Sequence, residues 1–323
     1  MRIFITGATG FIGQHLCKRL VAEGHDLTVL LRSPKKRNLL PKGVTFLNGD
    51  LSLFKDHNLV LPKFDYVIHL AGAIFAKNRV GYFEINFEGV KDLVTCLQNQ
   101  DWQLKRFLFA SSLAAAGPSN GEVPHIESDP LNPRDPYGEA KKAAEEWLQA
   151  QEIPSTSFRP AIVLGPGDEN TYTLFKMAKK GLGIKVAGID QQLSFVDVDD
   201  VVDALIKMMT IEGDLHQTYF IAHPEEITLP ELWRQLANAF SREVWLILIP
   251  QFLLFFFMIL ATAIYSILPF KNQLDYKQYR QMTGKAFVCS SQKLTDELGW
   301  TPKFDLKASL AKAIEGYKAL GKL

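Results

Sequence analysis

Short runs of β-branched and aromatic residues alternate with longer amphipathic stretches through the first half of the chain. Six of these runs are predicted as strands, at 3–6, 27–31, 45–47, 66–70, 107–110 and 157–158. Each is followed by a loop and a helical pattern, which is typical of parallel strands covered by helices on both faces. The pattern therefore predicts an α/β fold with a doubly wound parallel sheet of the Rossmann type.

The second half of the chain has a looser pattern, with Pro166, Gly167, Gly181, Gly183 and Gly188 close together. We expect residues 1–165 to form the Rossmann domain, with segments around 190–222 returning to it. Residues 166–323 are expected to form mainly a smaller C-terminal lobe that is interleaved with that domain.

No charged residue occurs between Glu243 and Lys271. Residues 252–268 read FLLFFFMILATAIYSIL and are apolar around the whole helical circumference, so an apolar helix is predicted over 244–270. Its uninterrupted part would be about 27 Å long, slightly short of a hydrocarbon core of about 30 Å. We expect it to lie on a membrane surface, and the alternatives are a helix buried in the core or in a dimer.

The composition is that of an ordinary globular protein, with 47% hydrophobic and 22% charged residues and a net charge of +1. No nucleic-acid partner is expected, because no net positive field would hold a polyanion. Cys17, Cys96 and Cys289 are far apart and form no CxxC pair, so neither a disulfide framework nor a metal site is indicated. With no signal-peptide pattern at the N-terminus, we expect a cytoplasmic protein, with residues 252–268 as the segment that would contact a membrane.

A glycine-rich loop, TGATGFIG, follows the first predicted strand and opens a helix. In this context Gly7 permits a tight turn, Gly10 lets the backbone approach a pyrophosphate, and Gly13 allows close packing of helix and strand. The loop predicts a dinucleotide site, to which Thr9, Phe11 and Ile12 also belong.

The end of the second strand is basic rather than acidic. An acidic residue here suits a free ribose 2′-hydroxyl, whereas an arginine suits a 2′-phosphate. The chain has Arg32, followed by Lys35, Lys36 and Arg37. This favours NADP(H) over NAD(H), although NAD(H) is possible and a basic loop without any ligand is the alternative.

Tyr137 and Lys141 are four residues apart on a predicted helix and therefore share a face. A nearby ammonium group is expected to lower the pKa of the phenol, so that Tyr137 can exchange a proton with an alcohol or carbonyl group. Together with the glycine-rich loop, this pair indicates an oxidoreductase.

These motifs, together with Gly49-Asp-Leu51 and His69-Leu-Ala-Gly72, resemble the extended short-chain dehydrogenase/reductase family, which includes NAD-dependent epimerases and dehydratases. The resemblance implies that the C-terminal lobe binds the substrate, and that Ser112 hydrogen-bonds the substrate oxygen beside Tyr137 and Lys141. It also implies a homodimer. It implies a cofactor set that includes Asp50, Leu51, Leu70, Ala71, Gly72, Ser111, Pro160 and Ile162, and substrate contacts by Asn86 and Leu113.

Within the family, the 3β-hydroxysteroid dehydrogenase and dihydroflavonol reductase branch looks most similar, because of the apolar segment and the Leu298-Gly-Trp300 tail. Nucleotide-sugar enzymes usually have an asparagine at the position of Ile162. We therefore expect an NADP(H)-dependent oxidoreductase that acts on a lipophilic alcohol or ketone, such as a sterol, isoprenoid or flavonoid. The alternatives are a nucleotide-sugar epimerase or dehydratase, and a non-catalytic dinucleotide-binding or membrane-scaffold protein.

Overall fold

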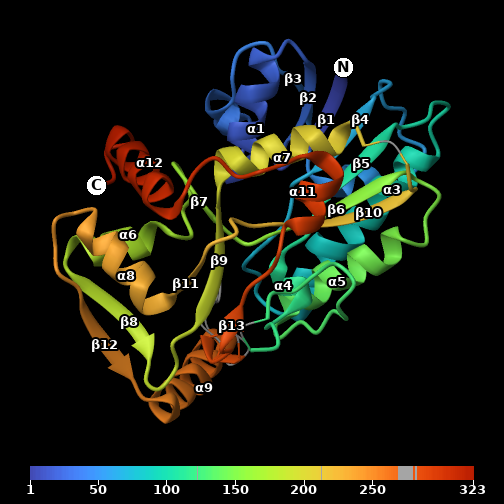
Figure 1. The fold of residues 1–323 in the computed structure, drawn as a ribbon. Helices are drawn as coiled ribbons and strands as arrows, with labels where there is room; N and C mark the ends of the chain where they lie inside the picture. Colours follow the sequence, from blue (N-terminus) through green and yellow to red (C-terminus); the bar gives the residue numbers. More distant parts are fainter. Residues whose placement is uncertain (122, 212, 268–278, 281) are drawn as a thin grey trace.

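The computed structural model describes residues 1–323 except 122, 212, 268–278 and 281 (Figure 1). Its main sheet has seven strands in the order β10-β6-β5-β4-β1-β2-β3, and all neighbouring strands are parallel. This confirms the predicted α/β fold. The strands are β1 (Arg2–Thr6), β2 (Asp26–Leu31), β3 (Thr45–Asn48), β4 (Tyr66–His69), β5 (Arg106–Ala110), β6 (Ser155–Pro160) and β10 (His216–Ile221).

Helices cover both faces of this sheet (Figure 1). Side chains alternate along β1, so Ile3 and Ile5 join the core on one face while Phe4 joins the core on the other. The first core is covered by α1 (Phe11–Ala22), α7 (Val198–Met209) and α11 (Gln292–Leu298), and the second by α3 (Gly89–Gln98) and α5 (Pro136–Leu148). Shorter elements in this half are η1 (Pro34–Leu39), η2 (Leu51–Lys55), α2 (Arg79–Phe83), η3 (Glu84–Glu88) and α4 (Leu113–Ala116).

The C-terminal lobe is built around β9 (Gln192–Asp197), which pairs with β7 (Ile162–Leu164) and β13 (Ala286–Phe287) in parallel and with β11 (Glu226–Thr228) antiparallel. Its core contains Phe195, Trp233 and Tyr317. Three helices pack there: α6 (Tyr172–Lys179), α8 (Leu229–Asn238) and α12 (Leu306–Ala319). Residues 192–221 therefore serve both halves, because β9 belongs to the lobe while α7 and β10 belong to the Rossmann half.

The predicted apolar helix over 244–270 is wrong in its first part. Residues Trp245–Ile249 form strand β12, which pairs in parallel with β8 (Leu182–Val186). Pro250 separates this strand from helix α9 (Gln251–Ile267). The physical reason is that residues 245–249 pair with β8, which the tryptophan and two isoleucines favour, and that Pro250 cannot donate the backbone hydrogen bond that a continuous helix would need. Residues 268–270 lie outside the described residues.

Helix α9 lies along the edge of the lobe, near β8, β12 and β13 (Figure 1). Leu254 and Met258 are buried in a small cluster with Val186 and Ile189, whereas much of the remaining helix surface is exposed. Within the described residues, no helix has the length and apolar character needed to cross a bilayer.

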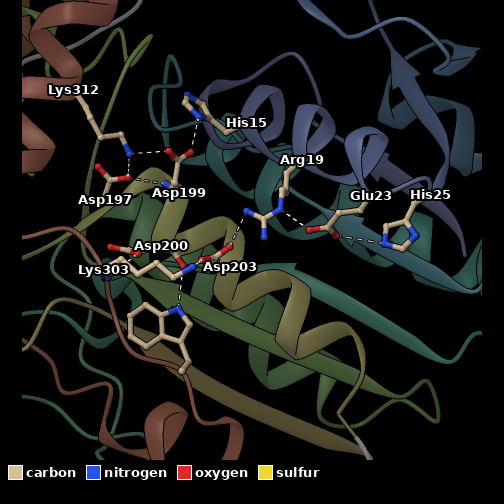
Figure 2. A network of polar contacts seen from close by, with 11 residues as sticks. His15, Arg19, Glu23, His25, Asp197, Asp199, Asp200, Asp203, Lys303 and Lys312 are labelled. Atoms are coloured by element: carbon tan, nitrogen blue, oxygen red, sulfur yellow. Dashed lines mark hydrogen bonds and ion pairs between the residues drawn. The ribbon is translucent and has the colours of Figure 1, made fainter.

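A polar network ties the C-terminal segment to the first helix of the Rossmann half (Figure 2). Lys312 of α12 donates to Asp197 and Asp199, at 2.6 and 2.7 Å. His15 of α1 lies 3.1 Å from Asp199 through Nδ1 and 3.0 Å from the carbonyl oxygen of Pro166 through Nε2. These contacts fix the orientation of α1, whose N-terminus begins at the glycine-rich loop.

Candidate active site

The glycine-rich loop between β1 and α1 leaves no room for side chains. Gly7 has φ +73°, and a Cβ atom there would lie 2.5 Å from the carbonyl carbon of Leu70. A Cβ atom on Gly13 would lie 2.4 Å from the carbonyl oxygen of Gly7. Gly10 precedes α1 without a side-chain cap, so the first N–H groups of the helix face outward as an anion site. This backbone cradle fits the pyrophosphate of a dinucleotide.

The carboxyl ends of the central strands meet at this loop, as expected for parallel strands. They enclose a cavity of about 440 Å³ between the glycine-rich loop, the strand ends and α5. It brings together thirteen of the predicted site residues: Gly7, Gly10, Phe11, Ile12, Gly13, Leu70, Gly72, Ser111, Ser112, Tyr137, Lys141, Pro160 and Ile162.

The other predicted cofactor residues, Thr9, Arg32, Asp50, Leu51 and Ala71, are not among the residues that line this cavity. Arg32 is exposed where β2 ends, and its charge helps to lower the pKa of Asp50, which is lowered mainly by hydrogen bonds from Ser52. Asp50 caps η2, which begins at Leu51. Thr9 lies within the glycine-rich loop. The N–H of Ala71 donates to the hydroxyl of Thr6 at 3.3 Å, which holds the loop after β4 against β1.

Tyr137 and Lys141 lie in the first turns of α5, which is capped by Asp135 accepting from the N–H of Gly138 at 2.8 Å. The Nζ atom of Lys141 donates to the carbonyl oxygen of Ala110 at 2.7 Å and lies 5.8 Å from the centre of the Tyr137 ring. The Tyr137 phenol hydrogen-bonds with the Ser112 hydroxyl. The three residues predicted as catalytic are therefore adjacent.

The expectation that Lys141 lowers the pKa of the phenol is wrong for this structure. Burial raises the pKa of Tyr137 to about 12, although the hydrogen bond with Ser112 opposes the shift. Burial also lowers the pKa of Lys141 to about 7, while the charge of Glu145 opposes this. The reason is that burial disfavours both charged forms more than the hydrogen bond with Ser112 and the charge of Glu145 favour them. Tyr137 is therefore a protonated phenol at neutral pH, suited to donating a proton.

The sequence analysis missed Glu145, which lies below Lys141 on the same face of α5 and is buried. Its carboxylate accepts two hydrogen bonds from Nε of Arg159, at 3.0 and 3.1 Å, and another from Nη2 at 2.5 Å. The hydroxyl of Ser111 also donates to it. The signal was available, since Glu145 follows Lys141 by four residues as Lys141 follows Tyr137. Ser111 is thus engaged with Glu145, while the Ser112 hydroxyl is the one that faces Tyr137.

Asn86 lies in the π-helical turn η3 and is fully buried. Its side-chain amide donates to the carbonyl oxygens of Ala73 and Tyr82, and its Oδ1 accepts from the N–H of Ala73, all at 3.0 Å. These bonds hold the loop after β4 beside the cavity. The predicted contact of Asn86 with substrate stays a prediction.

A second cavity, of about 320 Å³, adjoins the first and shares Ser112 with it. Leu113, predicted as a substrate residue, lies in its wall. Among the described residues that line it, only Ser112 and Gln191 have polar side chains; the others are Leu113, Ala114, Pro160, Ala161, Ile162, Leu193, Met282 and Phe287. The sequence analysis missed Gln191, Leu193, Met282 and Phe287, because local patterns do not show that β13 returns beside β9. An apolar group bound here would place its polar end at Ser112 and Tyr137.

Comparison with known proteins agrees with this geometry. Residues 3–222 match the model of the NAD dependent epimerase/dehydratase family. The chain is 28% identical to UDP-glucose 4-epimerase of Vibrio cholerae over 267 residues, which are 77% of this chain and 78% of the relative. It is 29% identical to ceramide reductase of Caulobacter vibrioides over 208 residues, covering 63% of this chain and 59% of that relative.

Solved structures show the same fold. The UDP-glucose 4-epimerase of Thermus thermophilus, solved with NAD, superposes with a TM-score of 0.77 over 98% of this chain and 99% of its own length, at 23% identity. The resemblance to extended short-chain dehydrogenases/reductases is therefore confirmed, with a family match that covers the whole dinucleotide cradle and the Tyr137–Lys141 pair. The chain belongs to the NAD dependent epimerase/dehydratase family.

Proposed function

We propose that this protein is an NADP(H)-dependent reductase of a lipophilic ketone or aldehyde. The observation that carries the proposal is the apolar cavity next to Ser112, whose described lining offers few polar groups. Apolar walls with a few polar groups at one end are typical of sites for hydrophobic small molecules. The similarity to ceramide reductase, a relative named for a lipid, supports this substrate class.

In the proposed reduction, each residue of the site has a separate role. A bound nicotinamide supplies or accepts the hydride. Ser112 hydrogen-bonds the carbonyl oxygen, and Tyr137 donates a proton to that oxygen as it becomes an alcohol. The Tyr137 phenol carries this proton at neutral pH, as a phenol with the ordinary pKa of about 10 also does, so the proton is available for transfer. Lys141 is held by the Ala110 carbonyl where it can supply a positive charge when protonated.

The basic loop after β2 supports NADP(H) as the cofactor. Arg32, Lys35 and Lys36 are exposed, and the guanidinium of Arg37 packs 4.1 Å from the centre of the Phe46 ring. Arg32→Ala is expected to weaken NADPH binding about tenfold and to leave NADH binding unchanged, because one charge-assisted hydrogen bond is lost. Lys18→Ala, at an exposed position on α1, is the control. Equal affinities of the wild type for both cofactors would contradict this assignment.

The second candidate function is that of a nucleotide-sugar epimerase, which the similarity to UDP-glucose 4-epimerase favours. An epimerase returns its hydride to the substrate, so it consumes no reduced cofactor overall. A diphosphate needs donors such as amide or guanidinium groups. Ile162 lies in both cavities and supplies none.

The experiment that tests the proposal measures NADPH oxidation by the purified protein with matched substrates. Long-chain β-keto amides, ketosteroids, flavanones and nucleotide sugars are compared, each with and without NADPH. We expect turnover with at least one lipophilic ketone and none with nucleotide sugars. Epimerisation of a nucleotide sugar without NADPH consumption would overturn the proposal.

A further inference from the structure

One face of the C-terminal lobe is made almost entirely of large apolar side chains that lie open to solvent. It spans β12 and α9, and we call it the β12–α9 face. Trp245 is 77% exposed and Phe256 is 64% exposed. Its members are Trp245, Ile247, Leu248, Phe252, Leu253, Phe256, Phe257, Ile259, Leu260 and Ile264. A contiguous apolar surface of this kind marks a site of interaction.

The opposite side of α9 is fixed to the protein. Leu254, Met258 and Ala261 recur at helical spacing and are buried, and the first two pack against Val186 and Ile189. β12 is held by its pairing with β8. The exposed side chains therefore project from a firmly attached element at the edge of the lobe (Figure 1).

The packed side of α9, opposite this face, adjoins the substrate cavity. Met282 packs into the same small cluster as Leu254 and Met258, and it also lines the apolar cavity beside Ser112. Gln191, on the other wall of that cavity, donates to the carbonyl oxygen of Gly284 at 2.7 Å. Met282 thus lies between α9 and the cavity, so a surface that covers α9 lies on the far side of this helix from the cavity wall.

Basic side chains lie near the start of β12 and next to Tyr279, whose ring contacts Phe255 near the start of α9. The N–H of Trp245 donates to the carbonyl oxygen of Gly181 at 2.7 Å, so the start of β12 lies next to the exposed Lys180, and Arg242 is exposed just before it. Arg280 is exposed beyond α9. Glu243 is the acidic neighbour at the start of β12. Lysine and arginine beside an apolar surface match anionic lipid headgroups, and a tryptophan at the rim matches the headgroup level of a bilayer.

We propose that the β12–α9 face docks on an anionic lipid surface, and that the substrate enters the cavity past Met282 from that surface. The route of entry rests on the proposed reductase function, whereas the docking does not. A second copy of the chain is the alternative occupant, and the exposed basic residues beside the face favour an anionic lipid surface over it. A monotopic arrangement needs only an apolar face and basic flanks.

The test is flotation of the purified full-length protein with phosphatidylcholine vesicles, with and without phosphatidylglycerol. The triple variant Phe252→Gln, Phe256→Gln, Phe257→Gln removes three exposed rings, while Val60→Gln, Leu215→Gln, Leu320→Gln removes exposed apolar groups elsewhere. We expect the wild type and the second variant to float with phosphatidylglycerol vesicles. The first variant should lose at least about tenfold in bound fraction, since three exposed rings no longer bury apolar surface in the lipid.

A second measurement does not depend on these substitutions. The fluorescence of Trp245, obtained as the difference between wild type and Trp245→Phe, should shift to shorter wavelength when vesicles are added. A wild type that does not float, a triple variant that floats like the wild type, or a dimer held together by this face in place of vesicle binding would overturn the proposal. A protein that floats but reduces no lipophilic ketone would overturn the proposed function and leave the docking intact.

Discussion

Helices α5 and α9 both depart from the usual distribution of side chains, in opposite directions. α5 buries the charged residues Lys141 and Glu145, which are 2% and 1% exposed. α9 exposes the apolar residues Phe252 and Phe256, which are 61% and 64% exposed. Burying a charge and exposing a large apolar group are both unfavourable, so each departure needs a compensating partner.

The two helices obtain that compensation from different sources. In α5 the protein itself provides the partners, since Lys141 donates to Ala110 and Glu145 binds Arg159. The exposed side of α9 obtains no comparable cover from the described residues. The comparison teaches that the buried charges of α5 are paired within the chain, whereas the exposed side of α9 is where we propose a partner from outside it.

The largest effect is expected from removing the phenol oxygen of Tyr137, which lies on α5. Tyr137→Phe should lower kcat about a thousandfold, because the proton donor is lost, while NADPH binding and the melting temperature stay nearly unchanged. Steady-state kinetics and cofactor titration measure both effects. Tyr66→Phe, a buried tyrosine of β4, is the control. Wild-type turnover by Tyr137→Phe would refute the assigned mechanism.

The next largest effect is expected from breaking the buried ion pair. Glu145→Ala leaves the guanidinium of Arg159 buried without its carboxylate, so the free energy of unfolding should fall by about 3–5 kcal/mol. Urea denaturation measures this. Glu88→Ala removes an exposed ion pair with Lys91 and should change it by no more than about 0.5 kcal/mol. Equal losses of unfolding free energy in the two variants would show that the buried Glu145–Arg159 pair contributes no more to stability than an exposed pair.

The two halves also differ in how much of their structure could be predicted from the sequence. The glycine-rich loop, the strands and the Tyr137–Lys141 pair were predictable, because local spacing determines them. β12 was not, because its strand conformation depends on pairing with β8 rather than on hydrophobicity, which fits a helix equally well. Met282 and Phe287 were not predicted, because they reach the cavity only through the pairing of β13 with β9, which is distant in sequence. The direction of the Tyr137 pKa shift was missed because it depends on burial, which spacing does not reveal.

Two substitutions on helix α9 compare how its packed side and its exposed side contribute to the free energy of unfolding. Met258→Ala creates a cavity on the packed side and should lower the free energy of unfolding by about 2 kcal/mol or more. Phe256→Ala on the exposed side should change it by less than about 0.5 kcal/mol. Denaturation without lipid measures both. A large loss in Phe256→Ala would mean that the chain itself covers this face.

A further expected effect is a pH dependence of stability due to Lys141. In the unfolded chain this lysine keeps its proton up to about pH 10.5, whereas in the folded protein it loses it near pH 7. Between these values the unfolded state binds more protons, so the free energy of unfolding rises with pH, by at most about 1.4 kcal/mol per pH unit. Below pH 7 both states are protonated and this contribution to the slope disappears.

Lys141→Met should remove this rise, which chemical denaturation at pH 7 to 9.5 can follow. The raised pKa of Tyr137 acts in the opposite direction only above about pH 10, where the unfolded phenol begins to ionise. An unchanged slope in Lys141→Met would show that the ammonium group is not desolvated.

The most direct test of net reduction is the fate of a labelled hydride. The wild type is incubated with NADPH that carries deuterium at the transferred position of the nicotinamide ring, together with the best lipophilic ketone, and the product is analysed by mass spectrometry. We predict one deuterium in the alcohol for each NADP⁺ formed, and neither product in Tyr137→Phe. Conversion of a nucleotide sugar into its epimer, without deuterium incorporation and without loss of NADPH, would contradict a reductase.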